Sequence, residues 1–202
     1  TLLGVTYSLN FELAANFAAG ATTGALDVLW NNEVINSFDT SSAVFDAYEI
    51  SLVGTGVPGE LSFRSVTSDP APQGPEIFTD APIFYYEKEV TIGGADVTLK
   101  AIAPGQANIY QALNGTLNVF NSETQTYSEV GAQASVVINA IGFNQQDDFI
   151  YGIADGTGLD ALGNAVQETD LMLIDASGLS YRIGETPFSS WSGDFDDSGN
   201  LW

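Results

Sequence analysis

Residues 5–13 read VTYSLNFEL, and this stretch decides the fold class. Its apolar side chains alternate with polar ones. The apolar side chains fall on one face, which carries Val5, Tyr7, Leu9, Phe11 and Leu13. A period of two residues is typical of a β-strand with one buried face. The stretch therefore predicts a half-buried strand near the start of the chain.

Short alternating runs continue along the chain, and many of its 21 glycines lie between them. We expect further strands at residues 26–30, 33–38, 45–53 and 61–66, and a hairpin over residues 85–101 that turns at residues 93–96. Asn31 and Asn32 separate the first two of these runs, and asparagine tolerates a positive φ, so a two-residue hairpin turn is predicted there. These patterns predict an all-β protein of antiparallel strands. The alternative is a helix over residues 12–25, where alanines cluster, although Gly20 and Gly24 weaken it.

Residues 68–75 read SDPAPQGP, with three prolines and one glycine in eight positions. Proline removes a backbone donor and restricts the residue before it, so this stretch does not fit the interior of a strand or helix. We therefore divide the chain into residues 1–67, a linker or crossover at residues 68–75, and residues 76–202.

The last ninety residues are self-similar. Tyr110 is followed four residues later by Asn-Gly-Thr. Tyr151, which lies 41 residues after Tyr110, is followed at the same distance by Asp-Gly-Thr. Phe120-Asn121 recurs 54 residues later as Ile174-Asp175, so about 13 residues are inserted within residues 158–169. Periods of about 40–50 residues with several short strands are typical of propeller blades. Because a closed propeller has at least about four blades, the two blade-like repeats predict a piece of a larger assembly.

The composition excludes several classes of function. The chain has 202 residues, with 26 acidic and 4 basic side chains, a formal charge of −22, and no Cys or His. Zinc sites of Cys and His, Cys nucleophiles and a Ser-His-Asp triad are therefore excluded. So negative a surface repels phosphate, so we expect no nucleic-acid partner. No apolar stretch reaches about 18 residues, so we expect no membrane insertion either. The negative charge instead attracts cations, so we expect these as partners, above all Ca²⁺.

Residues 193–202, GDFDDSGNLW, are the first candidate for a calcium loop. Oxygen-bearing side chains stand at loop positions 1, 3, 5 and 7: Asp194, Asp196, Ser198 and Asn200. Alternate oxygens in a tight turn wrap a hard cation, and a glycine at position 6 permits the reversal. The acidic residue expected at position 12 is missing, and the alternative is a polar hairpin turn.

A weaker calcium candidate lies at residues 155–163, DGTGLDALG, with Asp155 and Asp160 as ligands. This stretch matches all but the first glycine of the nonapeptide GGxGxDxUx of calcium β-rolls. A single copy lacks a partner turn, so the alternative is a glycine-rich insertion without metal.

Nothing in the spacing of the carboxylates defines a catalytic pair. Glu87 and Glu89 share one face of an expected strand, where outward charges explain them, and Asp147-Asp148 is expected in a solvated turn. The aromatic residues that could stack on sugars are expected mainly in the core: Trp30, Tyr85, Tyr86, Tyr110 and Trp191. We therefore expect no enzymatic activity.

Two parts of the chain resemble known families. Residues 5–66, with YSLNF, ALDVLWNNEVI, FDAYEISLVGTG and LSFRSV, resemble carbohydrate-binding-type β-sandwich modules of large secreted RTX-type bacterial adhesins. Residues 107–202, with NGTLNVFNSETQTY, INAIGFNQQDDFIYGI, LMLIDASG and GDFDDSGNLW, resemble a propeller-type repeat domain of secreted bacterial proteins. The resemblance implies a β-sandwich-like segment, a propeller-blade-like segment, an extracellular location and calcium dependence.

The sequence thus predicts a non-catalytic module of a calcium-dependent adhesin on a bacterial cell surface, with a role in adhesion or biofilm. It would bind a glycan or peptide on a host or neighbouring cell, or position adjacent domains of the same adhesin. A monomer is expected, and the chain, which starts at Thr1 without a leader, is expected to be an excised piece of a longer protein. The alternatives are a purely structural module and a propeller-type hydrolase or lactonase.

Overall fold

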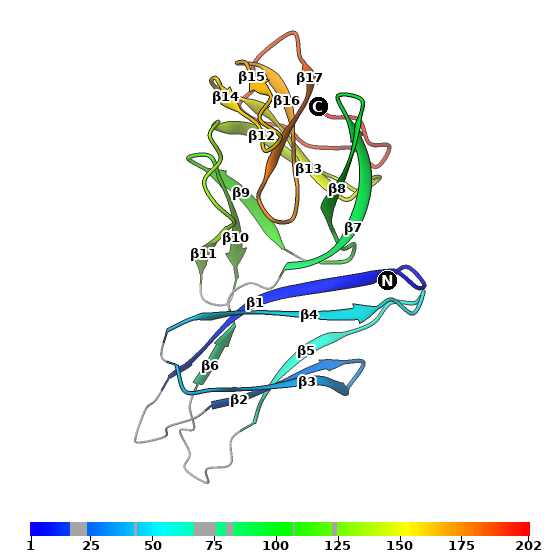
Figure 1. The fold of residues 1–202 in the computed structure, drawn as a ribbon, viewed down its shortest axis with the longest axis vertical. Helices are drawn as coiled ribbons and strands as arrows, with labels where there is room; N and C mark the ends of the chain where they lie inside the picture. The colour runs from blue at the N-terminus through cyan, green and yellow to red at the C-terminus, as the bar shows by residue number, and fades with distance from the viewer. Residues whose placement is uncertain (17–23, 43, 67–75, 80–82, 107, 123–124) are drawn as a thin grey trace. The chain divides into compact units, whose positions relative to one another are not determined.

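The computed structural model describes residues 1–16, 24–42, 44–66, 76–79, 83–106, 108–122 and 125–202, and its regular structure there consists of β-strands (Figure 1). This confirms the predicted all-β fold class. None of the described segments forms a helix with the length and apolarity that a bilayer crossing demands. The chain divides into two compact units, unit 1 (Thr1–Phe84) and unit 2 (Tyr85–Trp202).

Unit 1 contains two antiparallel sheets. One consists of β1 paired with β4 and β6, and the other has the order β3-β2-β5. The strands are β1 (Thr6–Asn16), β2 (Gly24–Trp30), β3 (Glu33–Thr40), β4 (Asp46–Val53), β5 (Leu61–Val66) and β6 (Glu76–Thr79). Phe11 on β1 packs edge-on against Phe38 on β3 and Phe63 on β5, with ring centroids 5.4 and 5.5 Å apart. The aromatic rings of the two sheets therefore meet between them, as in a β-sandwich.

The pattern of residues 5–13 is confirmed by β1. The side chains of Tyr7, Leu9, Phe11 and Leu13 are buried, and that of Val5 is half-buried. The two-residue turn between β2 and β3 is also confirmed, because Asn31 and Asn32 have φ values of 52° and 66°.

The alternative helix over residues 12–25 is replaced by strand at both ends, where β1 continues to Asn16 and β2 begins at Gly24. Residues 17–23 between them lie outside the described residues. The first residues of this segment form a strand and not a helix, because the apolar alternation of β1 extends through Leu13 and buries one whole face of the strand.

The division between the units falls after Phe84. The proline-rich residues 68–75, where a boundary or crossover was expected, lie outside the described residues. Strand β6 comes after that stretch but pairs antiparallel with β1, from Leu13 opposite Thr79 to Asn16 opposite Glu76. Residues 76–79 therefore belong to unit 1 because of a pairing that is distant in sequence.

Unit 2 begins with a hairpin and continues as two antiparallel sheets (Figure 1). The hairpin joins β7 (Ile83–Ile92), which starts in unit 1, to β8 (Ala95–Ile102), and it turns at Gly93-Gly94, within the predicted turn. One sheet has the order β11-β10-β9 and the other β12-β13-β16-β17. Their strands are β9 (Ile109–Leu113), β10 (Thr116–Asn121), β11 (Thr126–Val130), β12 (Ile138–Asn144), β13 (Phe149–Ala154), β16 (Asp170–Ile174) and β17 (Ser180–Glu185).

The predicted self-similarity corresponds to strand order. Strands β9, β10 and β11 form a three-stranded meander in which β10 lies in the middle. Strands β13, β16 and β17 form a second meander with the same arrangement, in which β16 lies in the middle. The predicted insertion lies between β13 and β16, where β14 (Gly158–Leu159) pairs with β15 (Ala165–Val166) as a separate small hairpin. Unit 2 therefore contains two meander repeats, the second enlarged by one hairpin.

Candidate functional site

The first predicted calcium loop forms a tight hairpin. Phe195 and Leu201 form an isolated antiparallel bridge, and the backbone groups of Asp194 and Trp202 are hydrogen-bonded in both directions, at 3.2 and 2.9 Å. Between them, Gly199 has a φ of 80°, a conformation that favours glycine over other residues. The chain therefore reverses at residues 196–200, as the sequence predicted.

Asp196 organises this turn with its carboxylate. Oδ1 accepts hydrogen bonds from the backbone N–H groups of Ser198 and Asn200, both at 2.9 Å. Oδ2 accepts one from Asn200 Nδ2 at 2.9 Å and one from Trp202 Nε1 at 3.1 Å. The side-chain amide of Asn200 contributes most to lowering the pKa of Asp196, followed by the Asn200 backbone and the Trp202 indole, and the resulting pKa is about 2.

Calcium would have to compete with these hydrogen bonds. The four predicted ligands Asp194, Asp196, Ser198 and Asn200 lie in one hairpin, but the Asn200 amide turns its N–H toward Asp196, and Asp194 Oδ1 accepts from the backbone of Phe195. Within the described ranges, no three His, Cys, Asp or Glu side chains converge as metal ligands. Calcium binding at this loop therefore stays a prediction.

The two carboxylates of the second predicted calcium site, Asp155 and Asp160, differ in burial and in their hydrogen-bond partners. Asp155 is exposed and accepts one hydrogen bond, from Asn139 Nδ2 at 3.0 Å. Asp160 is buried, and its carboxylate accepts hydrogen bonds from backbone and side-chain groups of the turn that follows it. Burial alone would raise the pKa of Asp160, but hydrogen bonds from Asn164, Arg182 and Leu162 outweigh burial and lower it.

Three five-residue segments of unit 2 fold into the same turn. They are the first Asp turn (160–164, DALGN), the second Asp turn (175–179, DASGL) and the third Asp turn (196–200, DDSGN). In each, Oδ1 of the first residue accepts from the backbone N–H groups of the third and fifth residues. The backbone N–H of the first residue donates to the carbonyl of the fifth, and the glycine in fourth position donates to the carbonyl of the first.

The first two Asp turns also hold the edge of a neighbouring strand. Asp160 Oδ2 accepts from the backbone N–H of Arg182 at 3.1 Å, and the N–H of Ala161 donates to the carbonyl of Ser180 at 2.9 Å. Both partners lie on β17, the last strand of its sheet. The inserted hairpin thus uses its Asp turn to satisfy backbone groups on an edge strand that would otherwise be open.

The second Asp turn does the same to β8. Asp175 Oδ2 accepts from the backbone N–H of Lys100 at 3.4 Å, and the N–H of Ala176 donates to the carbonyl of Lys100 at 2.8 Å. Asp175 is buried, and together with Asp160 it acts on Tyr181. Burial first, and then these two negative charges, raise the pKa of Tyr181 to about 12.

An ion pair supports the first Asp turn. Arg182 binds Asp170 through two hydrogen bonds, from Nε at 2.6 Å and from an η nitrogen at 2.9 Å. The Asp170 side chain is only 1% exposed, so burial alone would raise its pKa, but the guanidinium of Arg182 and the backbone N–H of Gln167 lower it. Arg182 therefore presents its backbone to one carboxylate and its side chain to another.

Sequence reasoning missed Asp175, Asp170 and their basic partners. The signal that could have found the turns is the recurrence of Asp-x-x-Gly-x at residues 155, 160, 175 and 196, although the match at Asp155 does not form this turn. Glu87 and Glu89 are exposed, as expected for outward charges. Asp147 and Asp148 lie in the turn between β12 and β13, but they are half-buried there and accept hydrogen bonds from the hydroxyls of Tyr151 and Tyr86, at 2.7 and 2.6 Å, so the expected solvated turn is wrong for their side chains. Of the possible sugar-stacking residues, Tyr85 and Tyr86 are buried, Trp30 and Tyr110 are half-buried, and Trp191 is 82% exposed.

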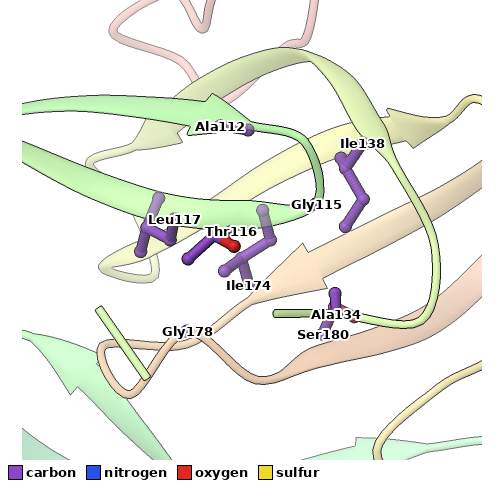
Figure 2. A pocket seen from close by; sticks show the side chains of 9 residues that line it. All are labelled: Ala112, Gly115, Thr116, Leu117, Ala134, Ile138, Ile174, Gly178 and Ser180. Carbon is purple, nitrogen blue, oxygen red and sulfur yellow. The ribbon is translucent and has the colours of Figure 1, made fainter. Parts of the chain in front are cut away.

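A cavity lies between the two repeats of unit 2 (Figure 2). Its lining includes Leu117 from β10, Ile138 from β12, Ile174 from β16 and Ser180 from β17. The cavity volume of about 10 Å³ is just enough for one water molecule, far below the several hundred Å³ of small-molecule sites. This space therefore reflects packing between the repeats and does not offer a ligand pocket.

The comparisons with known proteins concern the same segment. Residues 106–202 match the model of a family described as a repeat of unknown function (DUF6923). No curated protein and no solved structure matches the chain. The matched segment contains both meander repeats and all three Asp turns, so the chain is similar to this repeat in the part where the turns recur.

Proposed function

We propose that this chain is a non-catalytic, domain-positioning module of an extracellular bacterial surface adhesin of the RTX type. The observation that carries this proposal is the use of the Asp carboxylates. In the first two Asp turns, the aspartate closes its own turn and binds the backbone of a separate strand. Such contacts fix strands of unit 2 relative to one another, and a positioning module requires a unit that is rigid in this way.

Calcium stabilisation is part of this proposal, and the charge supports it. Lys100 and Arg182 are two of the four basic residues, against 26 acidic ones. A formal charge of −22 on about 200 residues makes the folded chain repel itself. Divalent cations relieve this repulsion more effectively than Na⁺, and a secreted protein meets calcium at millimolar concentration.

Hydrogen exchange tests the positioning role. We expect the backbone amides of Lys100 and Arg182 to exchange as slowly as the central strands of their sheets, because both donate to a carboxylate. Asp175→Ala should speed exchange at Lys100 at least about tenfold, and Asp160→Ala should do the same at Arg182. The matched control is Asp155→Ala, which removes an exposed carboxylate that accepts from the side chain of Asn139 and from no strand backbone N–H. Unchanged exchange in the first two variants would overturn the positioning role.

A ligand-binding module of the same adhesin is the second candidate, and the exposure of Trp191 favours it. Trp191 is 82% exposed, and Phe188, three residues earlier, is 64% exposed. Exposed aromatic rings can stack on sugar rings, so we would screen a glycan array in calcium and then in chelator. Binding that Trp191→Ala abolishes would favour this candidate, and turnover of a sugar or lactone would instead establish an enzyme.

A further inference from the structure

The third Asp turn is an incomplete copy of the other two. In the first and second Asp turns, the N–H of the second residue, Ala161 or Ala176, donates to the carbonyl of an edge strand. The corresponding residue of the third Asp turn is Asp197. It is exposed, and no described residue accepts a hydrogen bond from its N–H. The donor that holds a strand in the other copies is therefore free here.

In the third Asp turn, a side-chain N–H takes the place of the strand N–H at the Oδ2 atom of the aspartate. In the first Asp turn, Asp160 Oδ2 accepts from the side-chain amide of Asn164 and from the backbone N–H of Arg182, at 3.0 and 3.1 Å. In the third Asp turn, Asp196 Oδ2 accepts from the side-chain amide of Asn200 and from Trp202 Nε1, at 2.9 and 3.1 Å. The indole N–H therefore stands in for a strand N–H.

In both occupied copies the bound strand residue is basic. The carboxylates bind the backbone N–H groups of Arg182 and Lys100, while the side chain of Arg182 binds Asp170 and that of Lys100 lies over the Tyr85 ring. Around the third Asp turn, Asp194, Asp196 and Asp197 lie within four residues, and Asp194 and Asp197 are exposed. A strand with a basic residue at the bound position would thus meet complementary charge.

We propose that the third Asp turn docks the edge of an extended strand from another protein segment that carries Lys or Arg at the bound position. The strand N–H replaces the Trp202 indole at Asp196 Oδ2, and the strand carbonyl accepts from the Asp197 N–H. This inference deepens the positioning role proposed above by naming the chemistry of the positioned partner. The backbone N–H groups of Lys100 on β8 and Arg182 on β17 are already bound by the other two Asp turns and are not available to the third.

The test uses the whole chain and a capped peptide with the sequence of residues 178–186, GLSYRIGET, which contains the strand bound by the first Asp turn. In ¹H–¹⁵N NMR titrations, we expect saturable shifts of the Trp202 indole N–H and the Asp197 amide. Methylating the backbone nitrogen of the peptide's arginine removes the donor to Asp196 Oδ2 and should weaken binding roughly ten- to a hundredfold, as expected for a charge-assisted hydrogen bond. Changing that arginine to glutamate keeps the donor and should weaken binding by a smaller factor, through charge repulsion.

Variants of the chain separate docking from general attraction to negative charge. Asp197→Pro removes the free N–H at the second position of a tight turn, where proline is favoured, and should weaken binding at least about tenfold. Asp197→Ala keeps the N–H and should bind within about threefold of the unmodified chain, since a single exposed charge contributes little. Trp202→Phe removes the competing indole and should tighten binding, a result that general attraction does not produce.

The outcomes that overturn the docking site are equally specific. Binding that Asp197→Pro leaves unchanged, or that Trp202→Phe fails to tighten, would show attraction to charge alone. The absence of saturable shifts at millimolar peptide would show that the turn holds no strand. Dimerisation of the chain alone that Asp197→Pro abolishes would make the occupant a second copy, against the proposal. None of these results affects exchange at Lys100 and Arg182, so the positioning role is tested separately.

Discussion

Replacing Gly178 by alanine tests whether the two repeats of unit 2 are held at a fixed distance. Gly178 lies in the second Asp turn with a φ of 77°, and its backbone faces the end of β11. A Cβ added there would come closer than 3.0 Å to the carbonyl oxygen of Val130, a backbone atom that no side-chain rotation can move. From the opposite side, a Cβ on Gly131 would collide with the carbonyl oxygen of Ser177.

Gly163→Ala provides the matched control. Gly163 occupies the same position in the first Asp turn, with a φ of 83°, but an added Cβ there would meet nothing within 4 Å. Both variants force alanine into a left-handed conformation, which costs about 1–2 kcal/mol. Only Gly178→Ala adds overpacking, which costs about 1–3 kcal/mol more. At about 4 °C per kcal/mol for a domain of this size, we expect Tm to fall by about 4–8 °C for Gly163→Ala and about 8–20 °C for Gly178→Ala.

Urea denaturation followed by circular dichroism measures both costs and shows through the m-value whether the folded state stays compact. The Gly131→Ala, Gly178→Ala double variant should lose less stability than the sum of the two single variants, because one shift of the turn relieves both collisions. Equal urea midpoints for Gly163→Ala and Gly178→Ala would refute the close contact between the repeats.

Three further predictions concern pH, calcium and the core of unit 1. Because hydrogen bonds lower the pKa of Asp196 to about 2, its contribution to stability is complete above the usual aspartate pKa of about 3.9 and is lost as the pH falls toward 2. The difference in urea midpoint between the unmodified chain and Asp196→Asn should therefore shrink over that range, and a constant difference would contradict it. Millimolar Ca²⁺ should raise Tm by several degrees more than Na⁺ at equal ionic strength, since a specific site gives roughly 2.7 kcal/mol at a hundredfold excess over Kd. Equal shifts would indicate screening alone. Phe11→Asp should unfold unit 1, because it buries an unpaired charge among Phe38, Tyr48 and Phe63, and an unchanged thermal melt would show that this face of β1 is not buried.

The fold could be predicted where the deciding contacts are local in sequence. Residues 5–13 alternate strictly, so burial of one face follows from the pleat, and Asn31-Asn32 supports a hairpin turn through its own backbone preference. The boundary between the units was not predictable in this way. It depends on β6, whose pairing with β1 joins residues 60 to 66 positions apart, and the composition of the short β6 strand does not reveal its partner.

The candidate site was predicted in place, and the structure gives its carboxylates a role in the turn. The spacing of residues 194–200 suits a calcium loop, but an aspartate followed three residues later by glycine suits a turn closed by that aspartate equally well. The recurrence at Asp160 and Asp175 favours the turn. That Asp175 holds Lys100, 75 positions away, could not be read from the sequence, because only the folded sheets bring the two together.

The calcium ion and the docked strand that we propose would compete for the third Asp turn, and this gives a last prediction. A cation bound by Asp194 and Asp196 and a strand N–H bound by Asp196 Oδ2 require the same carboxylate. By thermodynamic linkage, each must weaken the other by the same factor. If both occupy this turn, millimolar Ca²⁺ should weaken binding of the peptide far more than Na⁺ at equal ionic strength, and saturating peptide should weaken calcium binding equally, as calorimetry can measure. Calcium that stabilises the chain but leaves peptide affinity at its Na⁺ value would place the cation elsewhere, among carboxylates that hold no strand.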